Sequence, residues 1–140
     1  MTAPEQFVWK GSAVRENLDG LQALVGQRLE AAGVPLKTRL QLAVAVEEVF
    51  VNIASYAYAP GTGDAAVSVE VSGAPKTVTV TFADRGRPYD PLARGDPDVT
   101  LGAEAREIGG LGIFMTKKLT DELRYEYRDG QNVLTLKKRL

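Results

Sequence analysis

The feature that most constrains the fold is a long apolar segment, residues 35–58, which is predicted to form one helix. Apolar residues occupy almost every side of that helix; they are Leu40, Leu42, Ala43, Val44, Val46, Val49, Phe50, Val51 and Ile53. A helix of this kind is buried in a core or spans a membrane. Glu47 and Glu48 stand at its centre, and each would cost about 2.5–3.5 kcal/mol in a bilayer. We therefore expect the core helix of a soluble protein.

A stripe of small and polar residues runs along this core helix. Its members are spaced by four, three, four and three positions; they are Gln41, Ala45, Glu48, Asn52 and Ser55. That spacing places them on one face. The Glu48 carboxylate and the Asn52 amide, one turn apart, are costly to bury unless they are hydrogen-bonded or face a wet cleft. The stripe alone fits either a solvated edge or a functional cleft, with Glu47 as a weaker candidate for the role of Glu48.

Shorter patterns predict the remaining elements. Short apolar or alternating runs indicate strands at residues 6–10, 65–71, 77–82, 123–127 and 133–137. Further helices are expected at residues 12–32, capped by Ser12 and ended by Gly33, and at residues 111–121. Asp129-Gly130 is typical of a hairpin turn. The order β-α-α-β-β-α-β-β predicts a single α+β domain over residues 1–140, a two-layer sandwich of a mixed sheet with the helices on one face.

The composition excludes several classes of function. Lysine and arginine number 17 and aspartate and glutamate 18, a net charge of -1, so no overall field favours nucleic acid or an anionic membrane. The chain has no cysteine, which rules out disulfides and suits a reducing cytosol. It has no histidine, which rules out phosphorylation on histidine and imidazole metal sites. Residues 1–5 show no signal-peptide pattern, so we expect a cytoplasmic protein.

Two further motifs lie at the beginning of an irregular stretch, residues 84–107, and just after its end. The first, DRGRP at residues 84–88, directly follows a predicted strand. Its aspartate can accept a hydrogen bond while its glycine lets the backbone approach a flat ligand. The second, GGLGI at residues 109–113, opens a predicted helix, whose free N–H groups and positive dipole end can bind phosphate. Each motif alone also fits a structural turn, and neither matches a P-loop or a GxGxxG dinucleotide motif.

In this order the three motifs resemble those of the GHKL ATPase superfamily, which has the Bergerat ATP-binding fold. That superfamily has a helix with an acid and an asparagine four residues later, an Asp-x-Gly box, and a glycine-rich box after a lid. The similarity runs from residue 36 to residue 140. The sequences EVFVN (48–52), DRGRPYDP (84–91) and GGLGI look most like the branch of anti-sigma-factor serine/threonine protein kinases. The strand and helix predicted before residue 36 also suit that branch.

The resemblance implies a role for each motif. Asn52 is expected to bind the magnesium ion that bridges the phosphates of ATP, and Glu48 to orient or deprotonate the attacking hydroxyl. Asp84 is expected to accept a hydrogen bond from the adenine amino group. The other residues expected to contact the nucleotide are Gly86, Pro88, Gly109, Gly110, Leu111 and Gly112.

The sequence departs from the family pattern just ahead of GGLGI. The family often has a basic residue there to meet the terminal phosphate, whereas this chain has Ile108. Either Arg106, as a catalytic residue, or Lys117 is expected to take that role. Residues 92–107 lack an apolar period and carry several charges, so they are predicted to act as a lid over the triphosphate.

The resemblance implies a kinase that transfers the terminal phosphate of ATP to a Ser or Thr of a small antagonist protein and regulates a sigma factor or similar partner. The alternative is an ATP-binding switch that holds such a partner without catalysis. The chain has no histidine, phosphoacceptor helix or transducer domain, which argues against a sensor histidine kinase and a gyrase-like or chaperone-like ATPase. Glu48 favours the kinase, because nucleotide binding alone needs no general base. No nucleic-acid or membrane partner is expected, and the exposed edge of residues 6–10 favours a homodimer.

Overall fold

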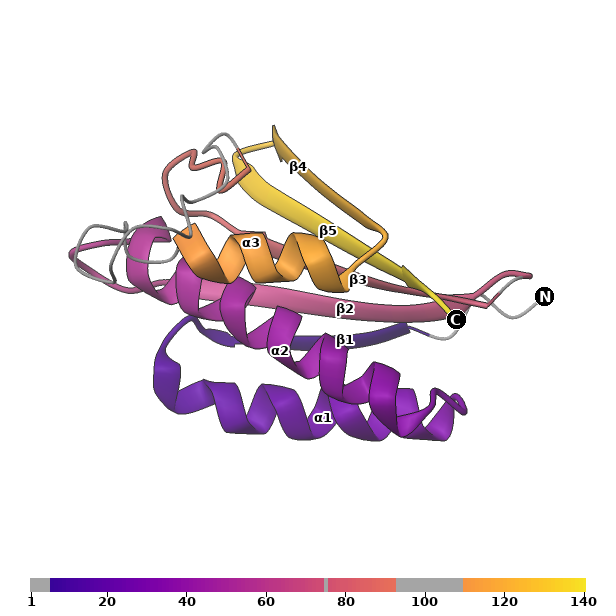
Figure 1. Ribbon diagram of the computed structural model, residues 1–140. Helices are drawn as coiled ribbons and strands as arrows, with labels where there is room; N and C mark the ends of the chain where they lie inside the picture. The colour runs from indigo at the N-terminus through magenta and orange to yellow at the C-terminus, as the bar shows by residue number, and fades with distance from the viewer. Residues whose placement is uncertain (1–5, 75, 93–109) are drawn as a thin grey trace.

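The structure, a computed structural model, describes residues 6–74, 76–92 and 110–140. Its main elements, in chain order, are β1 (Gln6–Ser12), α1 (Leu18–Ala31), α2 (Leu36–Asn52), β2 (Asp64–Ser72), β3 (Thr77–Asp84), α3 (Gly110–Leu119), β4 (Glu122–Arg128) and β5 (Gln131–Arg139) (Figure 1). This is the predicted order of strands and helices. The lid expected at residues 92–107 lies, apart from Leu92, outside the described residues.

The five strands form one sheet in the order β1-β2-β3-β5-β4, and every pair of neighbours is antiparallel. The α+β class and the two layers are confirmed, but the prediction of a mixed sheet is wrong. The chain passes from β3 through α3 to β4, and a crossover of this kind leaves the two strands that it connects parallel. β4 does run parallel to β3. The tight turn at Asp129 and Gly130, both with positive φ, then lays β5 between them. The parallel strands are therefore never neighbours.

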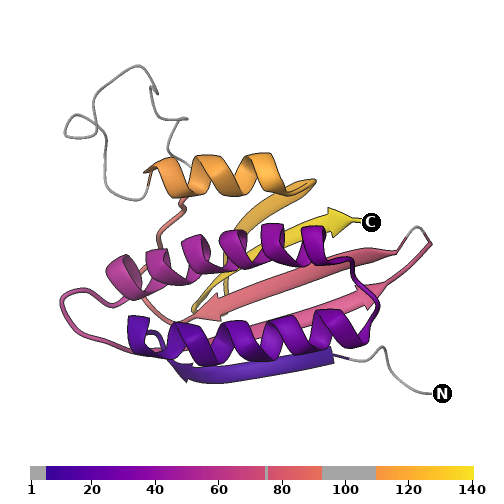
Figure 2. The ribbon, with the colours of Figure 1, turned by 60° about the horizontal axis from the view of Figure 1, so that its bottom comes forward.

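The three helices lie side by side over one face of the sheet (Figures 1 and 2). In β3 the side chains alternate, so that Val78, Val80 and Phe82 are buried under the helices and the threonines between them are only half-buried. Helix α2 lies in the middle of the helical layer and buries residues along most of its length; they are Leu42, Ala45, Val46, Val49, Phe50 and Asn52. Each large aliphatic or aromatic side chain so buried contributes about 1.5–3 kcal/mol. The predicted core helix is confirmed.

The same helix passes a simple test for membrane spans. By length and composition alone, Leu36–Ala57 could cross a bilayer. In the structure it packs against α1 on one side and α3 on the other, with the sheet beneath it (Figure 2). Core helices commonly share such a composition, because both environments select apolar residues.

Helix α1 begins later than predicted. Ser12 is paired with Asp64 as the last residue of β1 and cannot cap the helix, because α1 begins only at Leu18, directly after Asn17. A 3₁₀ turn at Arg15–Asn17 leads into α1, and the Asn17 amide donates to the Ser12 carbonyl at 2.8 Å. Gly33 ends the helix as predicted, with a φ of 80° that suits glycine.

The α-helical conformation of α2 ends at Asn52. Residues Ile53–Ala57 form a π-helical turn that continues α2 within the predicted range of 35–58. Such turns are rare and often occur at functional sites, because the wider turn changes the direction of nearby side chains. Here it lies between the polar stripe of α2 and the loop that follows β3.

Candidate functional site

Asn52 is the most buried polar residue of α2, with only 8% of its surface exposed. Its Nδ2 atom donates to the backbone carbonyl of Glu48, one turn earlier, at 3.2 Å. Because that bond uses the nitrogen, the amide is oriented with Oδ1 available as an acceptor or a metal ligand. The family resemblance implies an oxygen ligand at this position, and the orientation fits that role.

Glu48 lies one turn before Asn52 and is half-buried. Burial raises the pKa of its carboxyl above the usual value, and the neighbouring charge of Glu47 raises it further. Glu47 itself is exposed. A glutamate whose pKa is raised is a stronger base than usual, which suits proton abstraction from a hydroxyl.

Asp84 is the last inward-facing residue of β3. It continues the alternation of Val80 and Phe82, so a carboxylate takes the place of the next buried side chain, with 5% of its surface exposed. Its Oδ1 accepts two hydrogen bonds, from the backbone N–H of Gly86 at 2.9 Å and from Nδ2 of Asn132 at 2.9 Å. Among the described residues no donor reaches Oδ2, which leaves that oxygen to accept from a ligand.

The loop after Asp84 is fastened to the π-helical turn. A Cβ atom at Gly86 would lie 2.2 Å from the carbonyl oxygen of Ala57, so only glycine fits there. The next residue, Arg87, donates its backbone N–H to the same carbonyl at 3.0 Å. Gly86 therefore brings the loop close to the helix. Pro88, which was expected to shape the ligand pocket, is exposed and does not line it.

Asn132 is a site residue that the sequence analysis missed. It lies opposite Asp84 in the register of β3 and β5 and is buried, with 6% of its surface exposed. Side chains directly opposite on one face of a sheet are close neighbours, which accounts for the bond to Asp84. The predicted strand began one residue later, at Val133. The alternation of Asn132, Leu134 and Leu136 toward the core was the available signal.

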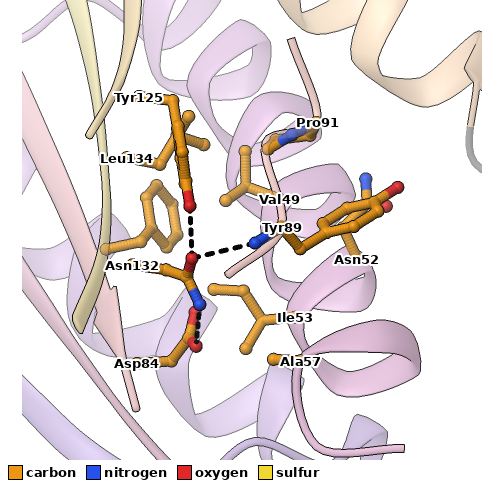
Figure 3. A pocket seen from close by; sticks show the side chains of 11 residues that line it. Val49, Asn52, Ile53, Ala57, Asp84, Tyr89, Pro91, Tyr125, Asn132 and Leu134 are labelled. Atoms are coloured by element: carbon orange, nitrogen blue, oxygen red, sulfur yellow. Dashed lines mark hydrogen bonds between the residues drawn. The ribbon is translucent and has the colours of Figure 1, made fainter. Parts of the chain in front are cut away.

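These side chains meet in a pocket between the end of α2, the end of β3 and the start of β5 (Figure 3). The enclosed part of the pocket measures about 30 Å³. Its walls are mostly apolar and carry a few polar groups; they are Val49, Asn52, Ile53, Ala57, Phe82, Asp84, Tyr89, Pro91, Tyr125, Asn132 and Leu134. The pocket thus joins Asn52 to Asp84, while Glu48 lies outside its lining.

One wall of the pocket includes the aromatic side chain of Tyr89. The ring of Tyr89, from the loop after β3, stacks on Tyr56 of the π-helical turn with centroids 5.4 Å apart and planes 24° apart. In Figure 3, Tyr89 lies between Asn52 and Pro91. Tyr89 therefore adds an aromatic ring, stacked on Tyr56, to the lining of the pocket.

The glycine-rich segment is described in part. Gly110, Leu111 and Gly112 form the first turn of α3, and both ribbon views place this end of α3 at the same end of the helical layer as the end of α2 (Figures 1 and 2). Lys117 is half-buried in the last turn of α3. Arg106 and Gly109 lie outside the described residues.

Comparison with known proteins assigns the fold and pocket to a family. A family model described as the histidine kinase-like ATPase domain matches residues 12–138. The chain belongs to the histidine kinase-like ATPase family. Membership confirms the resemblance to the GHKL ATPases and implies that this ATPase domain binds ATP.

Two characterised relatives of this ATPase domain are bacterial protein kinases by name. The serine/threonine-protein kinase BtrW of Bordetella bronchiseptica is 31% identical over 100 residues, which are 71% of this chain and 70% of BtrW. The serine-protein kinase RsbW of Listeria monocytogenes is 30% identical over 127 residues, which are 88% of this chain and 76% of RsbW. This ATPase domain is therefore a distant homologue of the anti-sigma-factor serine kinases.

Solved structures agree on the fold. The structure of the RsbU and RsbW domains of Rv1364c from Mycobacterium tuberculosis matches with a TM-score of 0.69 and 18% identity, over 97% of this chain and 32% of that chain. The structure of the SiaB-SiaC complex from Pseudomonas aeruginosa matches with a TM-score of 0.59 and 17% identity, over 96% of this chain and 89% of that chain. At these identities the likeness concerns the fold alone.

Proposed function

We propose that this ATPase domain is an ATP-dependent serine/threonine protein kinase of the anti-sigma-factor type. The observation that carries the proposal is the meeting of Asn52 and Asp84 in one pocket, with the carboxylate of Glu48 one turn before Asn52 on the same helix. Phosphoryl transfer depends mainly on positioning and on neutralising charge, and these residues supply an anchor, a metal ligand and a base.

Each of the three residues has one task in this proposal. Oδ2 of Asp84 accepts a hydrogen bond from the amino group of adenine and fixes the base between the apolar walls. Oδ1 of Asn52 would hold a magnesium ion, which would supply positive charge to neutralise the phosphates. Glu48 takes the proton from the attacking Ser or Thr hydroxyl. Its raised pKa makes it a better acceptor for that proton than an exposed glutamate.

The residues present fit magnesium rather than a metal held by protein alone. Among the described residues no group of three or more acidic side chains could hold an ion by itself. Magnesium usually keeps several waters and binds through one or two protein oxygens together with substrate phosphates. One amide oxygen at the phosphate end of the pocket is a ligand set of that kind.

The proposed partners are proteins. BtrW and RsbW are protein kinases by name, and the SiaB-SiaC match is a complex of two proteins. We propose a small antagonist protein with a Ser or Thr acceptor as substrate, a sigma factor or similar regulator as target, and a homodimer in the cytoplasm. The net charge of -1 offers nothing to nucleic acid or an anionic membrane.

A second candidate is an ATP-dependent switch that holds a protein partner without transferring phosphate. The observation in its favour is that Glu48 lies outside the lining of the pocket. In the kinase proposal the hydroxyl of the protein substrate enters between Glu48 and the phosphates, so the base need not touch the nucleotide.

The test incubates the chain with magnesium, ATP and purified candidate antagonist proteins and locates phosphate on Ser or Thr by mass spectrometry. The kinase proposal predicts transfer by the unchanged chain and reduced transfer by Asp84→Asn. ATP binding measured by calorimetry without transfer to any candidate would favour the switch.

A further inference from the structure

Asn132 uses its whole side chain in hydrogen bonds around the pocket (Figure 3). Its Nδ2 atom donates to Oδ1 of Asp84 at 2.9 Å and to the carbonyl of Arg87 at 2.9 Å. Its Oδ1 atom accepts from the backbone N–H of Tyr89 at 3.1 Å and from the hydroxyl of Tyr125. An amide has two N–H donors and two acceptor lone pairs, so all four are paired.

The neighbours fix which way the amide faces. The N–H of Tyr89 can only donate, so the amide oxygen must face it. The carbonyl of Arg87 can only accept, so the nitrogen must face that side. The donor next to Asp84 is therefore Nδ2, and no other side chain of this size offers two N–H donors together with an oxygen that accepts two bonds.

These bonds determine which oxygen of Asp84 meets a ligand. The N–H of Gly86 and Nδ2 of Asn132 both donate a hydrogen bond to Oδ1 of Asp84, the first from the loop and the second from the neighbouring strand. Two donors from different directions stop rotation of the carboxylate about its bond to Cβ. Oδ2 then has no donor among the described residues and stays available to accept a hydrogen bond from a ligand.

We propose that Asn132 is the positioning residue that holds Asp84 in this orientation and so gives the pocket its preference for a purine with an amino group. Asn132 does not touch the reacting atoms. It acts through Asp84, and through Tyr89, whose backbone it fastens next to the aromatic wall of the pocket. The inference rests on the proposed function, because it concerns how the ATP site selects its base.

The test measures the affinity ratio between ATP and purine riboside triphosphate, which lacks only the 6-amino group, by calorimetry with magnesium. In the unchanged chain the ratio should be about 10- to 100-fold, the value of one hydrogen bond to a charged group. Asn132→Ala should reduce it to about threefold or less, because Oδ2 is no longer held toward the amino group. Asn132→Val, which suits a strand better, should do the same and guards against misfolding of the alanine variant.

The control is Asn17→Ala, which removes another asparagine bond to a backbone carbonyl, at the start of α1 and away from the pocket. It should leave the ratio and both affinities unchanged. A ratio that stays at the unchanged chain's value in both Asn132 variants, while the two affinities fall together, would show that Asn132 only stabilises the loop and would overturn the inference. Absence of ATP binding by the unchanged chain would instead overturn the proposed function and the inference with it.

Discussion

The close contact between Gly86 and the π-helical turn makes a quantitative prediction for Gly86→Ala. The added Cβ would lie 2.2 Å from the carbonyl oxygen of Ala57, 2.5 Å from its carbonyl carbon and 2.7 Å from its Cβ. These atoms belong to a helix backbone and cannot swing aside, so the loop must move. That movement breaks the 3.0 Å bond from the N–H of Arg87 to the same carbonyl.

The expected cost combines two effects. Overpacking costs about 1–3 kcal/mol, and the lost backbone hydrogen bond costs about 0.5–1.5 kcal/mol. Gly86→Ala should therefore lower the free energy of unfolding by roughly 2–4 kcal/mol and the melting temperature by roughly 6–12 °C for a domain of this length. ATP affinity should fall as well, because the same loop positions Asp84.

Urea denaturation followed by circular dichroism measures this change, and Gly26→Ala is the matched control. Gly26 lies in α1, and a Cβ there would have no atom within 4 Å. Alanine at that position should stabilise the helix by about 0.5–1 kcal/mol. A Gly86→Ala variant as stable as the unchanged chain would refute the close approach of loop and helix.

Three further predictions concern the site and the assembly. Asp84→Asn should lower ATP and ADP affinity about tenfold to more than a hundredfold with the fold intact. The Oδ1 atom of the new asparagine can keep both structural hydrogen bonds, while an amide nitrogen replaces the acceptor Oδ2. Unchanged affinity in calorimetry would remove Asp84 from the site. The raised pKa of Glu48 means that its ionised form destabilises the folded state, so Glu48→Gln should raise the free energy of unfolding at pH 7, measured by urea denaturation, by about 0.2–1 kcal/mol. That gain should disappear as the pH falls through the raised pKa of Glu48 toward the usual value of 4.5, and a gain that persists there would contradict the assignment. Light scattering at micromolar concentration should give a homodimer, since β1 is an edge strand paired only with β2, and a stable monomer would contradict it.

The sequence predicted the parts of the site that follow local rules. Asn52 could be found because a polar residue stands in a helix that is otherwise apolar. Asp84 could be found because it ends the alternating run of β3 just before a glycine turn. In both cases a buried polar side chain breaks a regular apolar pattern, which is visible without knowledge of the tertiary structure.

Other features depend on contacts between distant parts of the chain. Asn132 was not singled out from the sequence, because its burial is set by pairing with Asp84, 48 residues away. Pro88 was expected in the pocket, but the loop turns at Gly86 and presents Tyr89 and Pro91 instead. The strand neighbours could not be predicted either, because the position of β5 between β3 and β4 depends on its pairing with β3, a distant part of the chain. Loop paths and strand neighbours are properties of the whole fold.

The most direct test of the proposed kinase is the rate of phosphate transfer to Ser or Thr of a purified antagonist protein by Glu48→Gln and Glu47→Gln. If Glu48 is the general base, Glu48→Gln should reduce the rate about 10²- to 10⁴-fold while ATP affinity and partner binding change little. Glu47 is exposed, and its replacement should leave transfer near normal. Near-normal transfer by Glu48→Gln together with its loss in Glu47→Gln would contradict the account, because the catalytic carboxylate would then lie on the other side of α2.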